Sequence, residues 1–539
     1  MLAALLVVLA LITPNRLQEL EPAAFARLPL EALVYLAVVL ALPPSLGRVR
    51  TPLALAAGVV LGLTAVLKLL DVGFLEVLNR PFDTLIDWRY AGSLVETVRD
   101  SFGNGIGTAL LVVAALSAVA LLVLLPLSVL RVTRVAARHR RPASQAVAAL
   151  AALWLVLAVL DVRSNAGTLA SRDAGGYVYG QVSRIPSELR DQGQFAEDAK
   201  EDPLQRVPAE DLLTGLRGKD VLFVFVESFG RVAVEGSSFS PGVNAVLSSG
   251  TEQLNEAGFS SRSAFLTSPT FGALSWLAHA TLQSGVWVDS QQRYDKLVTS
   301  SRLTLSQLFG RAGWRSVAAV PANTRDWPQG AFYHYDHIYD SRNLGYEGPR
   351  FGYPRMPDQY TLDAFYRLEL AKEQRRPVMA EIDLITSHAP WSRTPRMIKP
   401  SAVGDGSVYE GMPEQLASEK DIWPSPRRVK AAYGESIEYS LNALVSFVTT
   451  YGDDDLVVVM LGDHQPATIV SGEDAGRDVP IAIVARDPAV LDAVSDWGWD
   501  DGLRPEPEAP VWRMDVFRDR FLAAFGSSGE TGPGPADAR

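Results

Sequence analysis

Cysteine is absent from this sequence of 539 residues, and histidine occurs only six times. The absence of cysteine excludes a disulfide framework, a thiolate metal site and a cysteine nucleophile. The sequence also lacks an excess of basic residues, and its formal net charge of −11 argues against a nucleic-acid partner. Apolar residues make up 48% of the chain, but they crowd into residues 1–162. This uneven distribution predicts a membrane sector followed by a soluble one.

Five apolar stretches within residues 1–162 predict a transmembrane domain of five helices. They are Met1–Ile12, Leu28–Leu46, Pro52–Leu70, Thr108–Leu130 and Ala143–Leu160. The first stretch is short, but it lacks the basic start and the cleavage site of a signal peptide, so we expect a retained span. Arginines cluster between the second and third stretches and between the fourth and fifth, which predicts that both loops are cytoplasmic. The chain after Asp161 is then extracytoplasmic, as in a multi-pass protein of the plasma membrane.

Three further segments follow the membrane region. Residues 163–218 are polar, and we interpret them as a juxtamembrane linker. Residues 219–525 alternate strand-like and helix-like runs, which predicts an α/β doubly wound sheet with helices on both faces. Residues 526–539 are rich in proline and glycine, so we expect a disordered tail. The strand-like runs are Val221–Val226, Ser316–Val320, Val378–Ile385, Leu456–Leu461 and Pro480–Val484, and the helix-like runs are Ala273–Ser284, Leu303–Arg311, Thr361–Gln374, Pro426–Thr449 and Val511–Phe525.

Two of the strand-like runs end at potential metal ligands. Val221–Val226 is a β-branched and aromatic run, typical of a strand buried on both faces, and it ends at Glu227. The run Leu456–Leu461 is followed by Asp463 and His464. Because open α/β sheets bind ligands at the carboxyl ends of their strands, we expect these three side chains to converge. Two carboxylates and an imidazole suit Zn²⁺ or Mn²⁺ and, less well, Mg²⁺. Taken alone, each group is also typical of a loop carboxylate or a capped turn.

A hydroxyl-rich turn precedes the helix-like run Ala273–Ser284. It contains Ser268 and Thr270, and Ser275 follows near the start of the helix. A hydroxyl at a helix N-terminus lies beside backbone N–H groups that favour phosphate, and a nearby metal would lower its pKa and make it a nucleophile. The same pattern is also typical of an ordinary serine or threonine helix cap.

Two histidines differ in the roles that their surroundings indicate. His388 lies just beyond the strand-like run Val378–Ile385, in the sequence Thr-Ser-His-Ala-Pro-Trp. We interpret it as a group that binds substrate phosphate or a second metal, with capping of the strand as the alternative. We interpret His279 as a residue packed within a helix rather than as a ligand.

The order of these pieces resembles the alkaline-phosphatase/sulfatase superfamily. The pieces are a strand ending in Val-Glu-Ser, a threonine 43 residues beyond Glu227, a Ser-His-x-Pro-Trp turn and a strand followed by Gly-Asp-His. With five predicted spans ahead of the domain, the chain most resembles the lipoteichoic acid synthase-like membrane phosphoglycerol transferases, and phosphoethanolamine transferases share this layout. The resemblance implies an alkaline-phosphatase-like catalytic domain over residues 219–525.

The resemblance also implies roles for individual residues. Thr270 would be the nucleophile, with Ser275 and Ser268 as rivals for that role. His388 would match the family histidine that contacts the substrate. The ligands of one divalent ion (Mn²⁺ or Zn²⁺, possibly Mg²⁺) would be Glu227, Thr270, Asp463 and His464.

The expected substrate pocket departs from the family pattern. Phosphoglycerol transferases of the family carry an arginine after a Trp-Asn pair, whereas this sequence reads Trp327-Pro-Gln329 with Arg325 just upstream. We expect Arg325 and Gln329 to bind substrate, but the departure leaves the head group open. A formylglycine sulfatase needs the pattern C/S-x-P-x-R, which Ser268-Pro-Thr-Phe does not match. This mismatch argues against sulfate-ester hydrolysis.

The predicted function is therefore that of a membrane-anchored, metal-dependent phosphotransferase. It would move a phospholipid head group of the phosphoglycerol type to a glycan or lipid acceptor of the cell envelope, through a phosphothreonine intermediate. The alternatives are a phosphoethanolamine transferase, a phosphodiesterase or phosphatase of the same superfamily, and a catalytically inactive binding protein. The joint presence of Glu227, Asp463 and His464 argues against the last of these.

Overall fold

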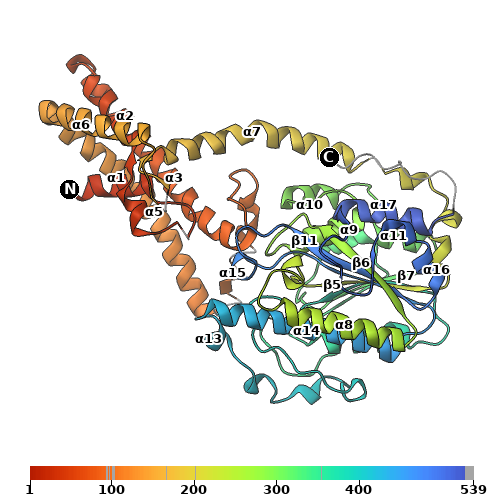
Figure 1. Ribbon diagram of the computed structural model, residues 1–539. Helices are drawn as coiled ribbons and strands as arrows, with labels where there is room; N and C mark the ends of the chain where they lie inside the picture. The colour runs from red at the N-terminus through yellow and green to blue at the C-terminus, as the bar shows by residue number, and fades with distance from the viewer. Residues whose placement is uncertain are drawn as a thin grey trace. The chain divides into compact units, whose positions relative to one another are not determined.

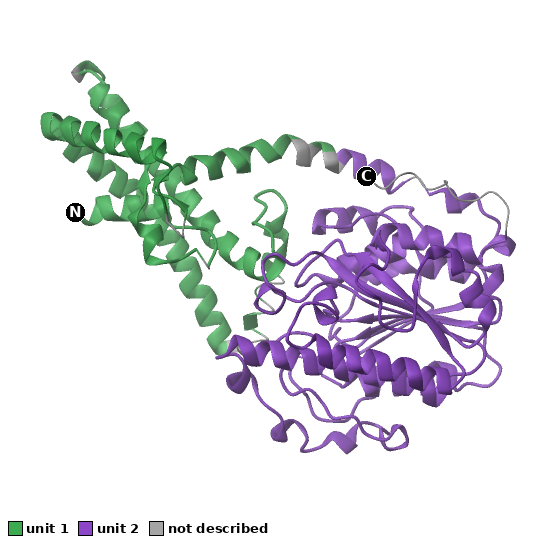
Figure 2. Cartoon of the chain, in the orientation of Figure 1, with its two compact units in different colours: residues 1–191 green, residues 192–539 purple. Residues whose placement is uncertain are grey.

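A computed structural model describes residues 1–17, 19–92, 95, 98–99, 104–164, 167–200, 202–353 and 355–527. The chain forms two compact units, Met1–Asp191 and Gln192–Arg539 (Figure 2). The tail expected to be disordered, residues 526–539, lies outside the described residues from residue 528 onward.

The first unit is helical. Its helices are α1 (Leu2–Ile12), α2 (Leu30–Ala41), α3 (Arg50–Leu78), α5 (Asn104–Arg138) and α6 (Arg140–Val159), its two-residue strands are β1 (Leu28–Pro29), β2 (Arg163–Ser164), β3 (Gly167–Thr168) and β4 (Ala170–Ser171), and α7 (Asp173–Asp198) follows. Within the described residues, three helical segments are long and apolar enough to cross a membrane: Ser45–Leu78, Gly105–Arg138 and Arg140–Val159.

The prediction of five spans is therefore confirmed for three of them. Helices α1 and α2 are apolar but have only 11 and 12 residues, whereas a span needs about 20. Proline explains where each one ends, because Pro14 follows α1 closely and the pair Pro43–Pro44 follows α2.

The arginine-rich segment between α5 and α6 differs from the expected loop. Helix α5 continues through Arg138, and only His139 interrupts it before α6 begins. The side chain of Arg140 donates hydrogen bonds to the backbone carbonyls of Leu40 and Leu42. These carbonyls belong to the last turn of α2, where a cation is favourable. Arg140 thus joins the start of α6 to the end of α2.

The second unit is built on a mixed sheet of nine described strands, in the order β12-β6-β11-β10-β5-β9-β7-β8 with β13 beside β6. Strands β10, β5, β9, β7 and β8 run parallel to one another, and β11 and then β6 continue the sheet antiparallel. The strands are β5 (Asp220–Val226), β6 (Ser260–Thr267), β7 (Arg315–Val320), β8 (His337–Asp340), β9 (Val378–Leu384), β10 (Leu456–Gly462), β11 (Asp478–Ala485), β12 (Asp500–Asp501) and β13 (Val511–Arg513).

Helices cover both faces of this sheet, as Figure 1 shows, so the doubly wound arrangement agrees with the prediction. The α helices of one face are α8 (Ser240–Glu256), α12 (Asp358–Phe365) and α14 (Pro426–Tyr451), and those of the other are α9 (Ser275–Ser284), α11 (Leu305–Arg311) and α17 (Met514–Phe525). The shorter helices are α10 (Gln291–Leu297), α13 (Glu419–Ile422), α15 (Thr468–Ser471) and α16 (Pro488–Asp492). Each face has its own apolar cluster, and strand β5 contributes alternate residues to the two.

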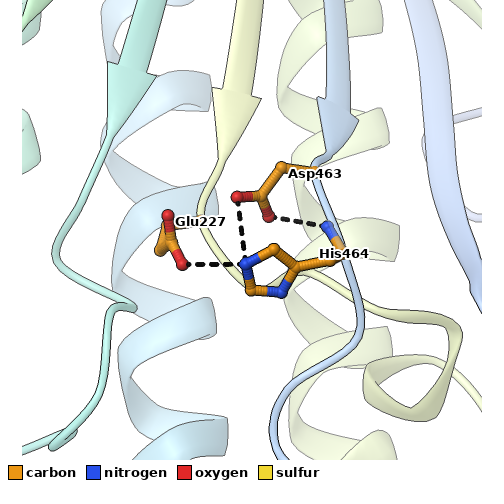
Figure 3. A group of neighbouring side chains, drawn as sticks. All are labelled: Glu227, Asp463 and His464. Carbon is orange, nitrogen blue, oxygen red and sulfur yellow. Dashed lines mark hydrogen bonds and ion pairs between the residues drawn. The ribbon is translucent and has the colours of Figure 1, made fainter. Parts of the chain in front are cut away.

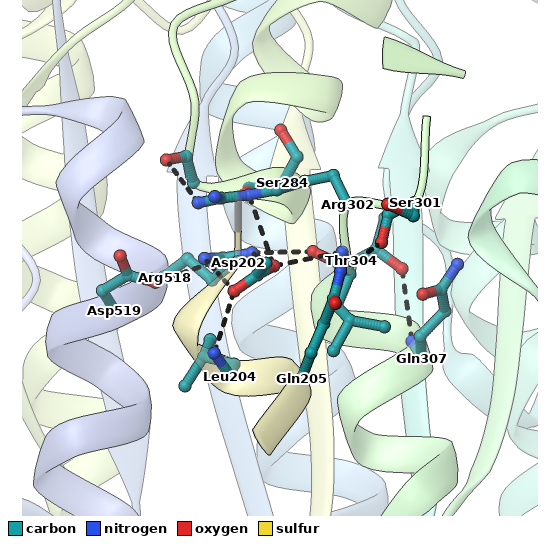
Figure 4. A network of polar contacts seen from close by, with 12 residues as sticks. Asp202, Leu204, Gln205, Ser284, Ser301, Arg302, Thr304, Gln307, Arg518 and Asp519 are labelled. Carbon is teal, nitrogen blue, oxygen red and sulfur yellow. Dashed lines mark hydrogen bonds and ion pairs between the residues drawn. The ribbon is translucent and has the colours of Figure 1, made fainter. Parts of the chain in front are cut away.

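A buried polar network fixes the segment that enters the second unit (Figure 4). The carboxylate of Asp202, whose side chain is fully buried, accepts hydrogen bonds from the backbone N–H groups of Leu204 and Leu303. It also lies 3.0 Å from Arg518 Nη1 and 3.3 Å from Arg302 Nε. Arg302 in turn donates to the carbonyl of Ser284, the last residue of α9. The network therefore ties the C-terminal end of α9 to the surrounding chain.

Candidate metal centre

The sheet brings two of the predicted ligand segments to one edge. Strands β5 and β10 are parallel neighbours, and Val226 is paired with Gly462. Glu227 and Asp463 follow these paired residues directly, so they leave the sheet side by side. The structure thus supplies the convergence that the strand-end pattern predicts.

Three side chains meet there, as Figure 3 shows. The Nε2 atom of His464 lies 3.3 Å from Glu227 Oε1 and 3.5 Å from Asp463 Oδ2. One potential ligand atom from each of the three residues lies within 4.8 Å of the others. A metal with tetrahedral bonds of about 2.1 Å separates its ligand atoms by about 3.4 Å, so this spacing suits a cation.

The hydrogen bonds around the group also fit a metal. Asp463 Oδ1 accepts from the backbone N–H groups of Ser228 and His464, at 2.7 and 2.8 Å. Among the described residues, Asp463 Oδ2 is buried without a hydrogen-bond donor. The Nδ1 atom of His464 donates to the carbonyl of Gln465 at 2.8 Å, so Nε2 is the ring nitrogen that faces the cluster. Each ligand is thus held on one side and open on the side of the cluster.

The electrostatics show an excess of buried negative charge. Burial disfavours a charged imidazole, but the carboxylates of Asp463 and Glu227 outweigh this and raise the pKa of His464 to about 9. Burial also opposes ionisation of Glu227, yet His464 outweighs it and holds the pKa of Glu227 below its usual value. Burial and the charge of Glu227 raise the pKa of Asp463 to about 6. A divalent cation would offset this charge.

The hydroxyl beside the cluster is that of Ser275, the first residue of α9. Ser275 Oγ lies 3.0 Å from Glu227 Oε2 and 3.3 Å from His464 Nε2. The preceding residue, Leu274, has the left-handed backbone conformation (φ 71°), and so does Gly272 (φ 72°). These two residues turn the chain sharply and point the start of α9 at the ends of the strands.

The other two hydroxyls of this turn make different contacts. Thr270 Oγ1 donates to the carbonyl of Ala273 at 2.6 Å, within the turn itself. Ser268 Oγ donates to the carbonyl of Asp463 at 2.6 Å, so it supports a ligand residue through the backbone. The geometry therefore favours Ser275, named above as a rival, over Thr270 as the hydroxyl that faces the cluster.

His388 lies at the same edge of the sheet, after β9. Strand β9 is the other parallel neighbour of β5, and the hydroxyl of Ser387 donates to the backbone carbonyl of Glu227 at 2.6 Å. The imidazole of His388 stacks on the ring of Tyr353, with centroids 3.9 Å apart. The structure thus brings His388 near Glu227, in a position that suits contact with a substrate.

Comparison with known proteins gives a family match for part of the second unit. Residues 219–478 match the family model described as Sulfatase.

The second unit carries a sulfatase-family domain.

Among solved structures, this chain is similar to the lipoteichoic acid synthase LtaP from Listeria monocytogenes, with 14% identity over 59% of this chain and 74% of that one, and a TM-score of 0.40. It is also similar to the phosphoglycerol transferase GacH from Streptococcus pyogenes in complex with sn-glycerol-1-phosphate (14% identity, 64% and 91% coverage, TM-score 0.34). A third is the periplasmic domain of EcEptC from Escherichia coli in complex with Zn (12% identity, 51% and 76% coverage, TM-score 0.33). No curated protein matches the sequence significantly.

The two substrate residues expected from the family pattern lie on the surface of the sulfatase-family domain. Arg325 and Gln329 are exposed, in the segment that follows β7. The same segment lines a hollow of about 240 Å³, whose walls include Trp327 and Arg342. Both residues therefore stay predictions as substrate ligands.

The sulfatase-family domain also holds a second group that strand-end reasoning does not single out. His279 Nδ1 lies 3.1 Å from Glu381 Oε1 and 3.6 Å from Asp383 Oδ1. Both carboxylates lie inside strand β9, in the run Val-Met-Ala-Glu-Ile-Asp-Leu. Two acidic residues within an otherwise apolar strand are the sequence signal that would have revealed this group, because an acidic residue is rarely buried without a partner.

Proposed function

We propose that this protein is a membrane-anchored, metal-dependent phosphotransferase whose nucleophile is Ser275. The observation that carries the proposal is the position of the Ser275 hydroxyl, against the cluster of Glu227, Asp463 and His464. A hydroxyl, two carboxylates and an imidazole at one sheet edge form a set that suits phosphoryl transfer through a covalent intermediate. The sulfatase-family match and the long apolar helices support the same conclusion.

The residues have separate tasks in this reaction. Ser275 Oγ, which lies 3.0 Å from Glu227 Oε2, attacks the phosphorus of a phosphodiester in a lipid head group, and its proton passes to solvent. The bond between phosphorus and the diacylglycerol oxygen breaks, and that oxygen takes a proton from solvent. His388 lies beside Glu227 and binds the phosphoryl group. A divalent ion (Mn²⁺ or Zn²⁺) held by Glu227, Asp463 and His464 would supply charge neutralisation and a lower hydroxyl pKa.

The phosphoserine is then resolved by a second hydroxyl. A glycan or lipid acceptor of the cell envelope attacks the phosphorus and frees Ser275, which is the transfer reaction. Water in place of the acceptor gives hydrolysis. We favour transfer because the membrane region keeps the domain near its lipid donor, which raises the effective concentration of that donor. In this account the domain lies on the extracytoplasmic side.

Turnover of a defined lipid tests the proposal. Purified full-length protein is incubated with phosphatidylglycerol vesicles and Mn²⁺ or Zn²⁺, and released diacylglycerol is measured with and without a glycolipid acceptor. Ser275→Ala should lose at least about a thousandfold in turnover, whereas Thr270→Val should keep it within about tenfold. Full turnover in Ser275→Ala together with loss of turnover in Thr270→Val would show that Thr270, and not Ser275, is the nucleophile. If diacylglycerol is released equally with and without the acceptor, and no head group reaches the acceptor, the protein is a hydrolase.

A further inference from the structure

One face of α9 carries three polar side chains at four-residue spacing. Ser275, His279 and Gln283 therefore lie above one another along the helix. Ser275 contacts Glu227 at the sheet edge. One turn later, His279 Nδ1 lies 3.1 Å from Glu381 Oε1, and two turns later Gln283 Nε2 donates to Glu381 Oε2 at 2.6 Å. Two successive turns of the helix are thus joined to a single carboxylate of β9.

Glu381 is built into the sheet as a buried anchor. The side chain of Glu381 is 2% exposed. In the sheet, Glu381 is paired with Phe223 of the neighbouring strand β5. The hydroxyl of Tyr335 also donates to its Oε2 atom, at 3.0 Å. A buried carboxylate is costly unless it is paired and hydrogen-bonded, and this one has three partners, two on α9 and one in the segment that precedes β8. Such a residue fixes the relative position of the elements that contact it.

His279 is held from two strands at once. Its imidazole stacks on the ring of Phe225 in β5, with centroids 3.8 Å apart and an interplanar angle of 16°. Its Nδ1 atom also faces Asp383, at 3.6 Å. Burial disfavours a charged imidazole, but Asp383, Glu381 and the more distant Asp463 outweigh this and raise the pKa of His279 to about 9. The surroundings of His279 therefore favour its charged form, beside the carboxylate of Glu381.

The position of the first residue of α9 depends on contacts made by the rest of the helix. Ser275 is the first helical residue, and the two left-handed residues before it form a turn whose own hydrogen bond runs from Thr270 to Ala273. The reacting hydroxyl therefore depends on where the helix body lies on the sheet. A displacement of about 1 Å at a reacting group can cost about a hundredfold in rate.

We propose that His279 and Glu381 are positioning residues: their ion pair fixes α9 on strands β5 and β9, and so holds Ser275 Oγ against Glu227 and His464. This inference rests on the proposed function of Ser275. It assigns a catalytic consequence to a buried pair that touches neither substrate nor the metal ligands directly. The ligand atoms of His279, Glu381 and Asp383 also have the spacing of a cation site, so metal content is part of the test.

Turnover of a small phosphodiester is the first readout. Full-length His279→Gln, Glu381→Gln and the double variant are assayed with bis(p-nitrophenyl) phosphate and Mn²⁺, and His337→Gln, an exposed histidine of β8, is the matched control. Each single variant should lose about ten- to a hundredfold in kcat with KM within about threefold, and the double variant should be no worse than either. If His279→Gln fails to fold, Glu381→Gln carries the same test, because its amide keeps the shape of the carboxylate.

Two outcomes of this assay overturn the proposal. A lower melting temperature with unchanged kcat and KM would show that the pair only stabilises the fold. A second equivalent of Mn²⁺ that wild type binds and His279→Gln loses would show that the group is a cation site. Wild type should bind a single equivalent, retained in both single variants.

A second readout needs no turnover. In Ser275→Cys, bound Co²⁺ should give a thiolate-to-cobalt charge-transfer band, because the sulfur would replace Ser275 Oγ beside the metal. Adding His279→Gln should remove most of this band at saturating Co²⁺, whereas adding His337→Gln should leave it. A band that survives His279→Gln, or no band in Ser275→Cys, overturns the positioning role. A band that depends on His279 in a protein that cleaves no phosphodiester would keep the positioning role and reject the proposed function instead.

Discussion

Each side chain of the candidate metal centre is oriented by a second contact. Asp463 turns one oxygen toward two backbone N–H groups, and His464 turns Nδ1 toward a backbone carbonyl. Glu227 accepts from the hydroxyls of Ser228 and Ser275 on its two oxygens, both at 3.0 Å. Such outer contacts fix the tautomer and orientation of metal ligands, and they make the site rigid before an ion enters.

Metal binding should stabilise the protein through these ligands. An ion present at a hundred times its dissociation constant adds about 2.7 kcal/mol, so we expect saturating Mn²⁺ or Zn²⁺ to raise the melting temperature by several degrees. Glu227→Gln and Asp463→Asn should lose this rise, and Asp496→Asn, which changes an exposed aspartate, should keep it. Differential scanning calorimetry of the metal-free protein with added metal checks the prediction. An undiminished rise in Asp463→Asn would show that the ion binds elsewhere.

The convergence of Glu227 with Asp463 and His464 could be predicted from the sequence, whereas the hydroxyl that faces them could not. Glu227 and the Asp463–His464 pair each follow an apolar run closely, and parallel strands bring their ends together. Between Thr270 and Ser275 the chain turns through two residues of left-handed conformation, Gly272 and Leu274. This turn determines where Ser275 lies. Leucine rarely adopts this conformation, so the sequence around Leu274 gives no signal of it.

At the level of elements, strand β9 contributes to the site through the residues that follow its carboxyl end. It ends just before Ser387 and His388, and the backbone N–H groups of Ile385 and Thr386 donate to Asp358 Oδ1, at 2.7 and 2.9 Å. Asp358 is the first residue of α12 and is fully buried. The helix thus holds the end of the strand from which His388 projects.

Asp358 should make stability depend on pH in a defined window. Burial raises the pKa of Asp358 to about 6, despite its hydrogen bonds, whereas in the unfolded chain it is close to the ordinary value of about 3.9. Below about pH 4 both states are protonated, so the contribution of Asp358 to stability is fully present. Between about pH 4 and 6 only the unfolded state ionises, and that contribution is lost.

Asp358→Asn removes this titration. The melting temperature of the variant relative to wild type should therefore rise between about pH 4 and 6 and stay level above it. Thermal denaturation across this range checks the prediction, with Asp496→Asn as the exposed control. A difference in melting temperature between Asp358→Asn and wild type that stays constant over the whole range would contradict the raised pKa of Asp358.

The elements that sequence reasoning missed are those whose pattern is mixed. Strand β6 reads Ser-Ser-Arg-Ser-Ala-Phe-Leu-Thr, with only three apolar residues together, yet it pairs with β11, β12 and β13. The helix-like run Val511–Phe525 begins as strand β13, because Val511–Arg513 pairs with β6 before α17 starts. Pairing across the sheet decided both cases, and local pattern carries little information about it.

At the scale of the whole molecule, the orientation of the chain does not depend on the number of spans. Three spans and five spans are both odd, and both leave the arginines of residues 131–141 on the cytoplasmic side. In either case we expect the sulfatase-family domain on the opposite, extracytoplasmic side. The absence of native cysteine makes this expectation simple to test.

Single cysteines introduced by Ser495→Cys and Arg134→Cys report the two sides, since both positions are exposed. A membrane-impermeant maleimide applied to spheroplasts should label the Ser495→Cys protein and leave the Arg134→Cys protein unlabelled until the membrane is broken. The wild-type chain, which has no thiol, is the background control. The reverse labelling pattern would place the sulfatase-family domain in the cytoplasm and contradict the proposed transfer to an envelope acceptor.

The most direct test of the account is the mass of the peptide that contains Ser275. Full-length protein is incubated with a lipid extract and Mn²⁺, quenched in acid, digested and mapped by tandem mass spectrometry. The account predicts a phosphoryl-containing adduct on Ser275, absent without metal and absent in Ser275→Ala, whose mass identifies the transferred head group. An adduct on Thr270, or turnover of lipid with Ser275 unmodified throughout, would contradict it.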